Sequence, residues 1–222
     1  MTKAELYTLL DALSLPDSII SRLDTSGWCF WKRKGQIRKN EIFPYLREFI
    51  EQRTKQTDTK VRENAYSVFA KLLLENFEPE HCQFLIDRTR IETNKYVLHT
   101  ILSGISRLQL PAGIDITAII MCSNHDEWMV RHSAIMALGR SNTDISRAAV
   151  RYWVMQEDEK QHKFELIYAN AALGYIGEPG DIALLEHHIH SRVPNVKDSA
   201  IYAINNIKQR FGMGSLSQNV PF

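Results

Sequence analysis

Residues 126–139 read DEWMVRHSAIMALG, and residues 169–181 read ANAALGYIGEPGD. In the first stretch Ala134 and Leu138 stand four positions apart, as do Ala169 and Leu173 in the second. Residues at this spacing lie on the same face of an α-helix, so each stretch predicts a helix with one apolar face. A related pattern recurs in other parts of the chain, and this repetition decides the fold that the sequence predicts.

Five segments align on a set of anchor residues that are separated by 33, 36, 35 and 31 positions. The anchors are Ala65, Leu98, Ala134, Ala169 and Ala200. The residue four positions after each anchor is apolar, and the residue seven positions after it is apolar in four of the five segments. Recurrence of one helical face at a nearly constant period predicts a stacked array of helical repeats.

The remaining patterns indicate helices and give little sign of strands. Pro16, Pro79, Pro111 and Pro179 stand near the starts of apolar-periodic stretches, where the missing proline N–H costs nothing. Asp58, Asp126 and Asn195 precede other stretches as candidate N-caps. We expect helices near 3–14, 16–24, 39–53, 58–75, 79–88, 93–108, 113–122, 126–140, 144–157, 162–176, 179–191 and 195–210. From residue 39 onward they form pairs, of which the second helix carries the anchor.

The anchors lie within longer motifs, Val61-Arg62-x-x-Ala65, Val130-Arg131-x-x-Ala134 and Val196-Lys197-x-x-Ala200. Over roughly residues 40–210 these motifs resemble HEAT repeats, most of all the short type first described in bilin lyases. The second and fourth motifs of the series depart from the pattern, because Asn94-Lys95 and Glu165-Leu166 replace Val-Arg.

The resemblance implies an all-α fold, a right-handed α-α superhelix of about five helix pairs whose second helices line a concave surface. We expect a helical N-terminal cap with a basic-aromatic connector over 1–38, the repeat solenoid over 39–211 and a flexible tail over 212–222.

The composition is that of an ordinary soluble protein. The 222 residues carry a net charge of +1, so no overall field attracts nucleic acid or an anionic membrane. No apolar run is long enough to cross a bilayer. Cys29, Cys82 and Cys122 are scattered, which argues against a disulfide framework or a zinc site. We therefore expect a cytoplasmic protein with no cofactor, no metal and no membrane association.

Three residues before the anchors the chain carries Arg62, Lys95, Arg131, Leu166 and Lys197, and four of these five are basic. Stacked helices lie about 8–10 Å apart, so these cations would form a ladder along the array. One interpretation is a positive stripe that follows an acidic partner or a phosphate backbone. In the other, each arginine pairs with an acidic residue of its own or the neighbouring repeat, with Asp58 and Glu127 as the expected partners.

Two regions are candidates for binding a partner. The second helices would present Arg62, Tyr66, Lys95, His99, Arg131, Ile135, Lys197 and Tyr202. The connector over 28–39 contains five cations, three aromatic residues and no acid, and it includes Trp28, Trp31, Lys32, Arg33 and Lys34. Aromatic side chains with cations between them suit stacked bases or a bound peptide. Alternatively, the connector aromatics close the end of the array while the cations stay solvated.

Patterns that would indicate an enzyme are scarce. No GxSxG, P-loop, HExxH or Rossmann glycine motif is present, so no catalytic residue is assigned. His187 and His190 have metal-ligand spacing without a further ligand nearby, which favours a solvated face. Alkylpurine DNA glycosylases also use HEAT-like helices, with an aspartate beside tryptophans and arginines. The nearest groups here are Trp128 with Asp126 and Arg131, or Trp153 with Asp158.

The sequence favours a scaffold that binds a protein or peptide in the concave groove. The alternative is a nucleic-acid-binding protein or a DNA glycosylase of the HEAT-like kind. Phosphate tracking by several cations predicts an affinity that falls steeply with salt, whereas a partly apolar protein groove predicts a shallow dependence. The identity of the partner and the oligomeric state stay open at this point.

Overall fold

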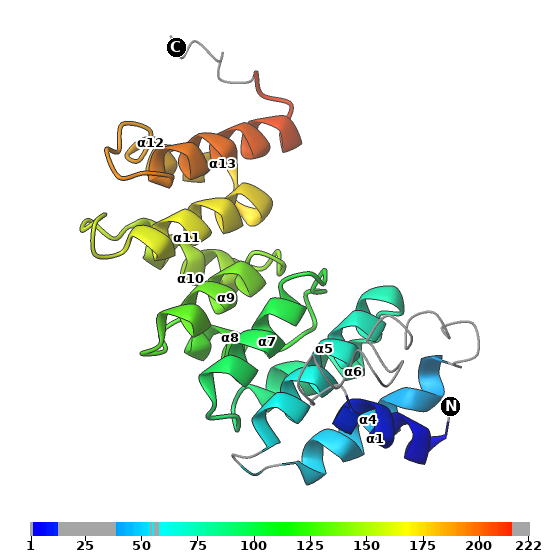
Figure 1. Ribbon diagram of the computed structural model, residues 1–222. Coiled ribbons are helices and arrows are strands. Elements are labelled where there is room, and N and C mark those ends of the chain that lie inside the picture. The colour runs from blue at the N-terminus through cyan, green and yellow to red at the C-terminus, as the bar shows by residue number, and fades with distance from the viewer. Residues whose placement is uncertain (1, 13–38, 54, 56–57, 215–222) are drawn as a thin grey trace. The chain divides into compact units, whose positions relative to one another are not determined.

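The computed structural model describes residues 2–12, 39–53, 55 and 58–214 of the chain. Over these residues the protein is all-α, with eleven α-helices, one short 3-10 helix and no strand (Figure 1). The all-α class predicted from the sequence is confirmed. Outside the described residues lie the helix expected near 16–24, most of the tail, and the connector with Trp28, Trp31, Lys32, Arg33 and Lys34.

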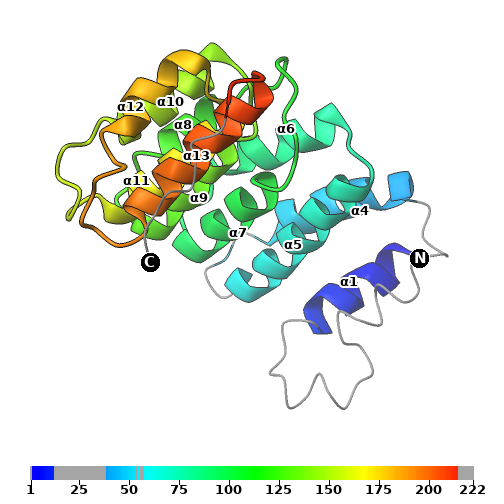
Figure 2. The same ribbon diagram turned by 90° about the horizontal axis from the view of Figure 1, so that it is seen from above.

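The chain divides into two compact units, Met1–Ile105 and Ser106–Phe222, and the division falls inside the expected repeat array. The first unit contains α1 (Lys3–Ala12), α4 (Lys39–Gln52), α5 (Thr59–Glu75), α6 (Pro79–Arg88) and α7 (Lys95–Ile105). Helix α5 lies beside α7 and also packs against α1, α4 and α6 (Figure 2). Two successive helix pairs, α4–α5 and α6–α7, therefore meet through their second helices.

An aromatic cluster fills the interior of the first unit. The Phe69 ring of α5 lies 4.9 Å from the Phe43 ring of α4 and 5.4 Å from the Phe84 ring of α6, measured between centroids. The His81 ring lies 4.0 Å from that of Phe43, and burial lowers the pKa of His81 although Glu78 and Glu80 oppose this effect. Because the cluster draws on three helices, it fixes their mutual packing.

The second unit contains three helix pairs. Its elements are α8 (Thr117–Cys122), α9 (Trp128–Leu138), α10 (Asp144–Val154), α11 (Lys163–Ile176), the 3-10 helix η3 (Pro179–Asp181), α12 (Ile182–Glu186) and α13 (Val196–Arg210). Helix α11 packs between α9 and α13, and the shorter helices α8, α10 and α12 pack against these three (Figures 1 and 2). We call α9, α11 and α13 the second-helix layer.

The periodic positions that the sequence singles out lie in the interior. The five anchors and the residues four and seven positions after them are all at most 4% exposed. The polar exception is Ser141, whose buried hydroxyl lies 3.2 Å from the Thr143 hydroxyl and so satisfies its hydrogen bonding. The prediction of an inward apolar face on each second helix is confirmed.

Several helix boundaries differ from the predicted ones, for local reasons. Helix α8 begins at Thr117 rather than near 113, because the Asp115 carboxylate accepts hydrogen bonds from the Thr117 backbone N–H and hydroxyl. The helix expected over 179–191 is divided into η3 and α12 and ends at Glu186. Helix α9 begins at Trp128, so the residue at its N-cap position is Glu127 and not Asp126.

Glycines allow the second helices to approach one another closely. A Cβ atom added at Gly104 of α7 would lie 2.5 Å from the Ala70 Cβ of α5. In the second unit, a Cβ at Gly139 would lie 2.9 Å from the Ala172 Cβ, and one at Gly174 would lie 3.1 Å from the Ala203 Cα. Gly139 and Gly174 explain the recurrent Ala-Leu-Gly motif, because each leaves room for a small residue of the next second helix.

We expect the Gly104→Ala variant to lose about 1–3 kcal/mol of stability, because the added methyl group overlaps Ala70. At a helical glycine without a close neighbour, the same substitution would increase the stability, since alanine is the better helix former. In the double variant Gly104→Ala/Ala70→Gly the two methyl positions are exchanged, and stability should return close to that of the parent. Urea unfolding followed by circular dichroism measures all three proteins. A stabilised single variant would contradict the proposed close approach.

Candidate partner-binding surface

Arg62 is held by groups of its own unit. Its Nε and Nη2 donate to the two Glu92 carboxylate oxygens at 3.0 and 3.2 Å, and its Nη1 donates to the Lys55 carbonyl oxygen at 2.6 Å. Both side chains of the ion pair are less than a tenth exposed. The Arg62 guanidinium therefore joins the start of α5 to the segment before α7, and its donors are already engaged.

Arg131 makes the corresponding interactions in the second unit. Its Nε and Nη2 donate to Glu165 Oε1 at 2.9 and 2.6 Å, and its Nη1 donates to the carbonyl oxygens of His125 and Asp126. Burial raises the pKa of Glu165, but the hydrogen bonds from Arg131 and from its own backbone outweigh burial, so the pKa is lowered. Both arginines pair internally, with Glu92 and Glu165 of the next helix pair.

Three residues expected at the binding surface lie in the interior instead, namely Arg62, Tyr66 and Ile135. The Tyr66 side chain is buried, its hydroxyl accepts a hydrogen bond from Arg88 Nε at 3.1 Å, and burial raises its pKa. Ile135 is also fully buried. The expectation for these three positions is corrected because a second helix packs against neighbours on several sides, and Tyr66 and Ile135, each directly after an anchor, face protein.

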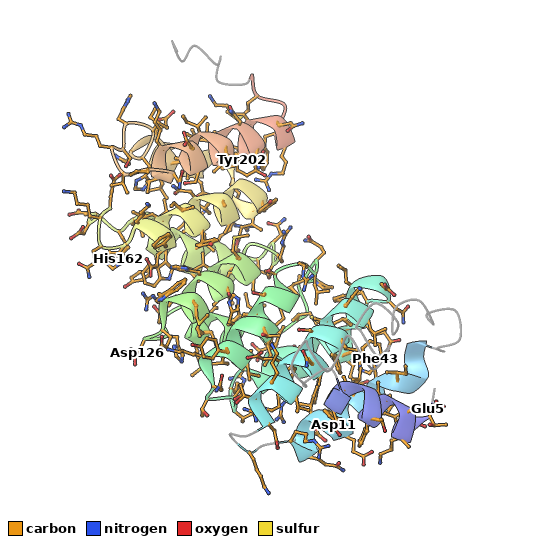
Figure 3. All side chains as sticks on the ribbon, in the orientation of Figure 1. Glu5, Asp11, Phe43, Asp126, His162 and Tyr202 are labelled. Atoms are coloured by element: carbon orange, nitrogen blue, oxygen red, sulfur yellow. The ribbon has the colours of Figure 1, made fainter. Side chains whose placement is uncertain are left out.

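The other candidates from the sequence retain some solvent exposure. Lys95, His99 and Lys197 are half-buried. Tyr202, labelled on α13 in Figure 3, is exposed, and 47% of its surface is accessible. Of the expected surface on the second helices, Tyr202 is thus the residue that offers the largest open apolar area.

The second-helix layer carries an aromatic cluster at the start of α9 and α11. Trp128 and Phe164 are 59% and 54% exposed, and their ring centroids lie 6.4 Å apart with nearly parallel planes. The His132 ring lies between them and Tyr168, 5.1 Å from Trp128, 5.6 Å from Phe164 and 4.9 Å from Tyr168. Large exposed aromatic side chains in mutual contact are typical of protein-binding surfaces.

A second group of side chains continues this surface toward the other end of the helices. The hydroxyls of Tyr175 and Tyr202 are 3.5 Å apart, and the Arg140 guanidinium lies over the Tyr175 ring at 4.5 Å. Hydrogen bonds with Tyr175 and Asn206 lower the pKa of Tyr202. We define the aromatic strip as the five exposed or half-exposed aromatic residues of the second-helix layer, Trp128, Phe164, Tyr168, Tyr175 and Tyr202.

Sequence reasoning missed most of this strip, although a signal was present. Phe164, Tyr168 and Tyr175 stand at positions i, i+4 and i+11 of one helix. At 3.6 residues per turn these positions share one face. The anchors predict only the buried face of α11, whereas these three aromatic residues lie on its opposite face.

Basic side chains outnumber acidic ones in α9, α11 and α13, all of whose residues the structure describes. The basic residues are Arg131, Lys163, Lys197, Lys208 and Arg210, and the acidic residues are Glu165 and Asp198. Because Glu165 is buried against Arg131, Asp198 is the carboxylate that these helices expose. The second-helix layer is therefore a locally positive surface on a chain of nearly zero net charge.

The tryptophan groups considered for a DNA glycosylase are arranged differently from that expectation. Arg131 donates to the backbone carbonyl of Asp126, and its remaining donors are taken by Glu165. Trp153 is buried within α10 and is 7% exposed. Neither tryptophan is grouped with an aspartate carboxylate and an available arginine.

His187 and His188 line a pocket of about 410 Å³ at the ends of α10 and α12. The buried His188 ring lies 2.8 Å from the Val154 carbonyl oxygen and 3.1 Å from Glu159 Oε1, while the Ser191 hydroxyl donates to Glu159 Oε2. These bonds connect the loops that follow the two helices. Among the described residues, no three His, Cys, Asp or Glu side chains are placed to hold a metal ion.

Within the part of the chain that the structure describes, none of the helices combines the length and apolar character needed to cross a membrane.

Comparisons with known proteins bear on the fold alone. No protein-family model matches the sequence, and no curated protein matches it. The chain is similar to the crystal structure of an engineered protein, with 16% identity over 93% of this chain and 92% of that one and a TM-score of 0.52. A second engineered protein aligns over 97% of this chain and 92% of its own, with 18% identity and a TM-score of 0.45.

Proposed function

We propose that this chain is a HEAT-like repeat protein that binds a protein or peptide partner along the aromatic strip of its second helices. In this arrangement the second helices form the concave side of the array, as the resemblance to HEAT repeats implies. The single observation that carries the proposal is the set of exposed aromatic side chains in mutual contact across α9, α11 and α13. Aromatic residues dominate the binding energy of many protein interfaces.

The nucleic-acid alternative is supported less well by the same surface. Phosphate tracking requires cations that are free to meet the backbone. Two of the four cations in the ladder are Arg62 and Arg131. Their guanidinium groups are already hydrogen-bonded to Glu92, Glu165 and backbone carbonyl oxygens. A peptide needs no such ladder, since its apolar side chains pack on the rings.

Peptide selection tests the proposal directly. A random-peptide phage library is panned on the full-length chain, and enriched peptides are synthesised and their affinity measured by fluorescence anisotropy. We expect Trp128→Ala and Phe164→Ala each to weaken binding about tenfold or more, because both side chains would lie at the centre of the contact. The matched control is Tyr152→Ala, which removes an exposed aromatic side chain of α10 and should leave affinity unchanged.

Fluorescein-labelled single-stranded and duplex DNA are measured under the same conditions. Tight binding of either, with an affinity that falls steeply as salt increases, would replace the peptide proposal by the nucleic-acid alternative. Peptides whose affinity is indifferent to both strip substitutions would also overturn the proposed surface.

A further inference from the structure

Arg140 differs from Arg131, Arg147 and Arg151 of the second unit in how its guanidinium is used. Arg131 and Arg151 each pair with a buried carboxylate, Glu165 and Asp181 respectively, and Arg147 pairs with Asp144 and Glu178. Arg140 donates from Nε to the Ser106 carbonyl oxygen at 2.6 Å. No carboxylate of the described residues pairs with it. The Arg140 guanidinium also interacts with the Tyr175 hydroxyl, and its Nη groups can donate to an outside anion placed beside that hydroxyl.

The surroundings of Arg140 hold the guanidinium in place. It lies over the Tyr175 ring at 4.5 Å, and a guanidinium stacked on an aromatic ring keeps its planar donor edge directed outward. Tyr175 and Tyr202 contribute two hydroxyl groups 3.5 Å apart on the adjacent helices. Hydroxyls and a guanidinium together form a donor set that suits a carboxylate.

The neighbouring charges have the sign that an anion requires. Lys208 and Arg210 follow Tyr202 on α13, and Arg210 donates to the Tyr175 and Gly177 carbonyl oxygens. Asp198, the exposed carboxylate of α13, lies one turn before Tyr202 in the direction away from Lys208 and Arg210. The end of the strip at Tyr175 and Tyr202 thus carries cations beside two hydroxyl groups, whereas at the other end Lys163 Nζ lies over the exposed Phe164 ring, 5.4 Å from its centroid.

We propose that Arg140, together with the Tyr175 and Tyr202 hydroxyls, binds an aspartate or glutamate side chain of an acidic peptide segment that lies along the aromatic strip. This inference rests on the proposed function and adds the chemistry of the partner. The apolar residues of the segment pack on Trp128 and Phe164, and its carboxylate meets the Arg140 fork at the other end. Charge complementarity between an acidic segment and this positive layer favours their association.

A double-mutant cycle with a selected peptide tests the inference. Each Asp and Glu of the peptide is changed in turn to Asn or Gln, and affinity is measured for the parent protein and for Arg140→Gln. We expect one acidic position whose replacement weakens binding to the parent about tenfold, as for a hydrogen-bonded charge, and has no effect on Arg140→Gln. Arg140→Lys keeps the charge without the planar fork and should recover only part of the affinity.

Two further variants separate recognition from folding. Tyr202→Phe keeps the ring and removes a hydroxyl of the cluster, and it should weaken acidic peptides selectively. Arg192→Gln removes an exposed cation outside the second-helix layer and should change nothing. Thermal unfolding checks that each variant is folded.

The outcomes separate the two proposals. Peptides that need Trp128 and Phe164 but show no coupling between an acidic position and Arg140 would overturn the carboxylate site and leave the proposed function intact. Failure to select any peptide that depends on the strip would overturn both.

Discussion

Replacing Arg62 with leucine is expected to lower the free energy of unfolding by about 3–5 kcal/mol. The substitution leaves the Glu92 carboxylate buried without its cation and removes the donor that satisfies the Lys55 carbonyl oxygen. An ionised group that is buried and unpaired costs far more than the pair itself contributes. Urea unfolding of the full chain, followed by circular dichroism, measures the loss.

The double variant Arg62→Leu/Glu92→Leu identifies the cause. Removing both charges should recover most of the stability, because the unpaired carboxylate is then absent. Lys60→Ala serves as the control on the same helix, since its pair with Glu63 is exposed and contributes at most about 1 kcal/mol. Equal losses for the single and double variants would show that the Arg62 stem, and not its charge, provides the stabilisation.

Replacing Asp181 with alanine is expected to cost about 2–4 kcal/mol. Asp181 is 1% exposed, and its oxygens accept hydrogen bonds from Arg151 at 2.5 and 3.1 Å and from the Glu178 backbone N–H at 2.8 Å. Alanine removes both the partner of Arg151 and one half of the capping box that starts η3. Arg151 is one-third exposed, so water stabilises the cation left behind and the loss stays below that for Arg62.

The Asp181→Asn variant distinguishes the two contributions. Asparagine keeps an acceptor for the Glu178 N–H but lacks the charge that attracts Arg151, so we expect a loss of intermediate size. Calorimetric unfolding temperatures of the three proteins give the order. An asparagine variant as unstable as the alanine variant would assign the whole effect to the ion pair.

The interior of this protein was predictable from the sequence because burial follows a local rule. An apolar residue at i, i+4 and i+7 must face away from water in any helix that forms, and the anchors Ala134 and Ala169 obey this rule. The helix ends were less predictable. The start of α8 depends on one carboxylate, Asp115. It accepts a hydrogen bond from the Thr117 backbone N–H, which a helix beginning earlier would use for its own hydrogen bonding.

The binding surface was less predictable because it depends on what lies beside each helix. Tyr66 and Ile135 occupy the position after an anchor, and only the packing of adjacent helices reveals that this position is enclosed. The partners of Arg62 and Arg131 stand 30 and 34 residues away in the sequence, about one repeat further on. Local spacing favoured Asp58 and Glu127, whereas stacking brought Glu92 and Glu165 within reach.

The glycine-alanine junctions at Gly139 and Gly174 have a consequence for how such a surface can diversify. Buried small residues hold α9, α11 and α13 at a fixed spacing. The solvent-facing positions of these three helices are therefore also fixed relative to one another. Side chains at these solvent-facing positions can be exchanged without disturbing the glycine-alanine junctions, since Trp128, Phe164 and Tyr202 take no part in the close approach of the helices at Gly139 and Gly174. Laboratory evolution restricted to these outward positions should therefore retarget the protein to new ligands while its melting behaviour stays constant.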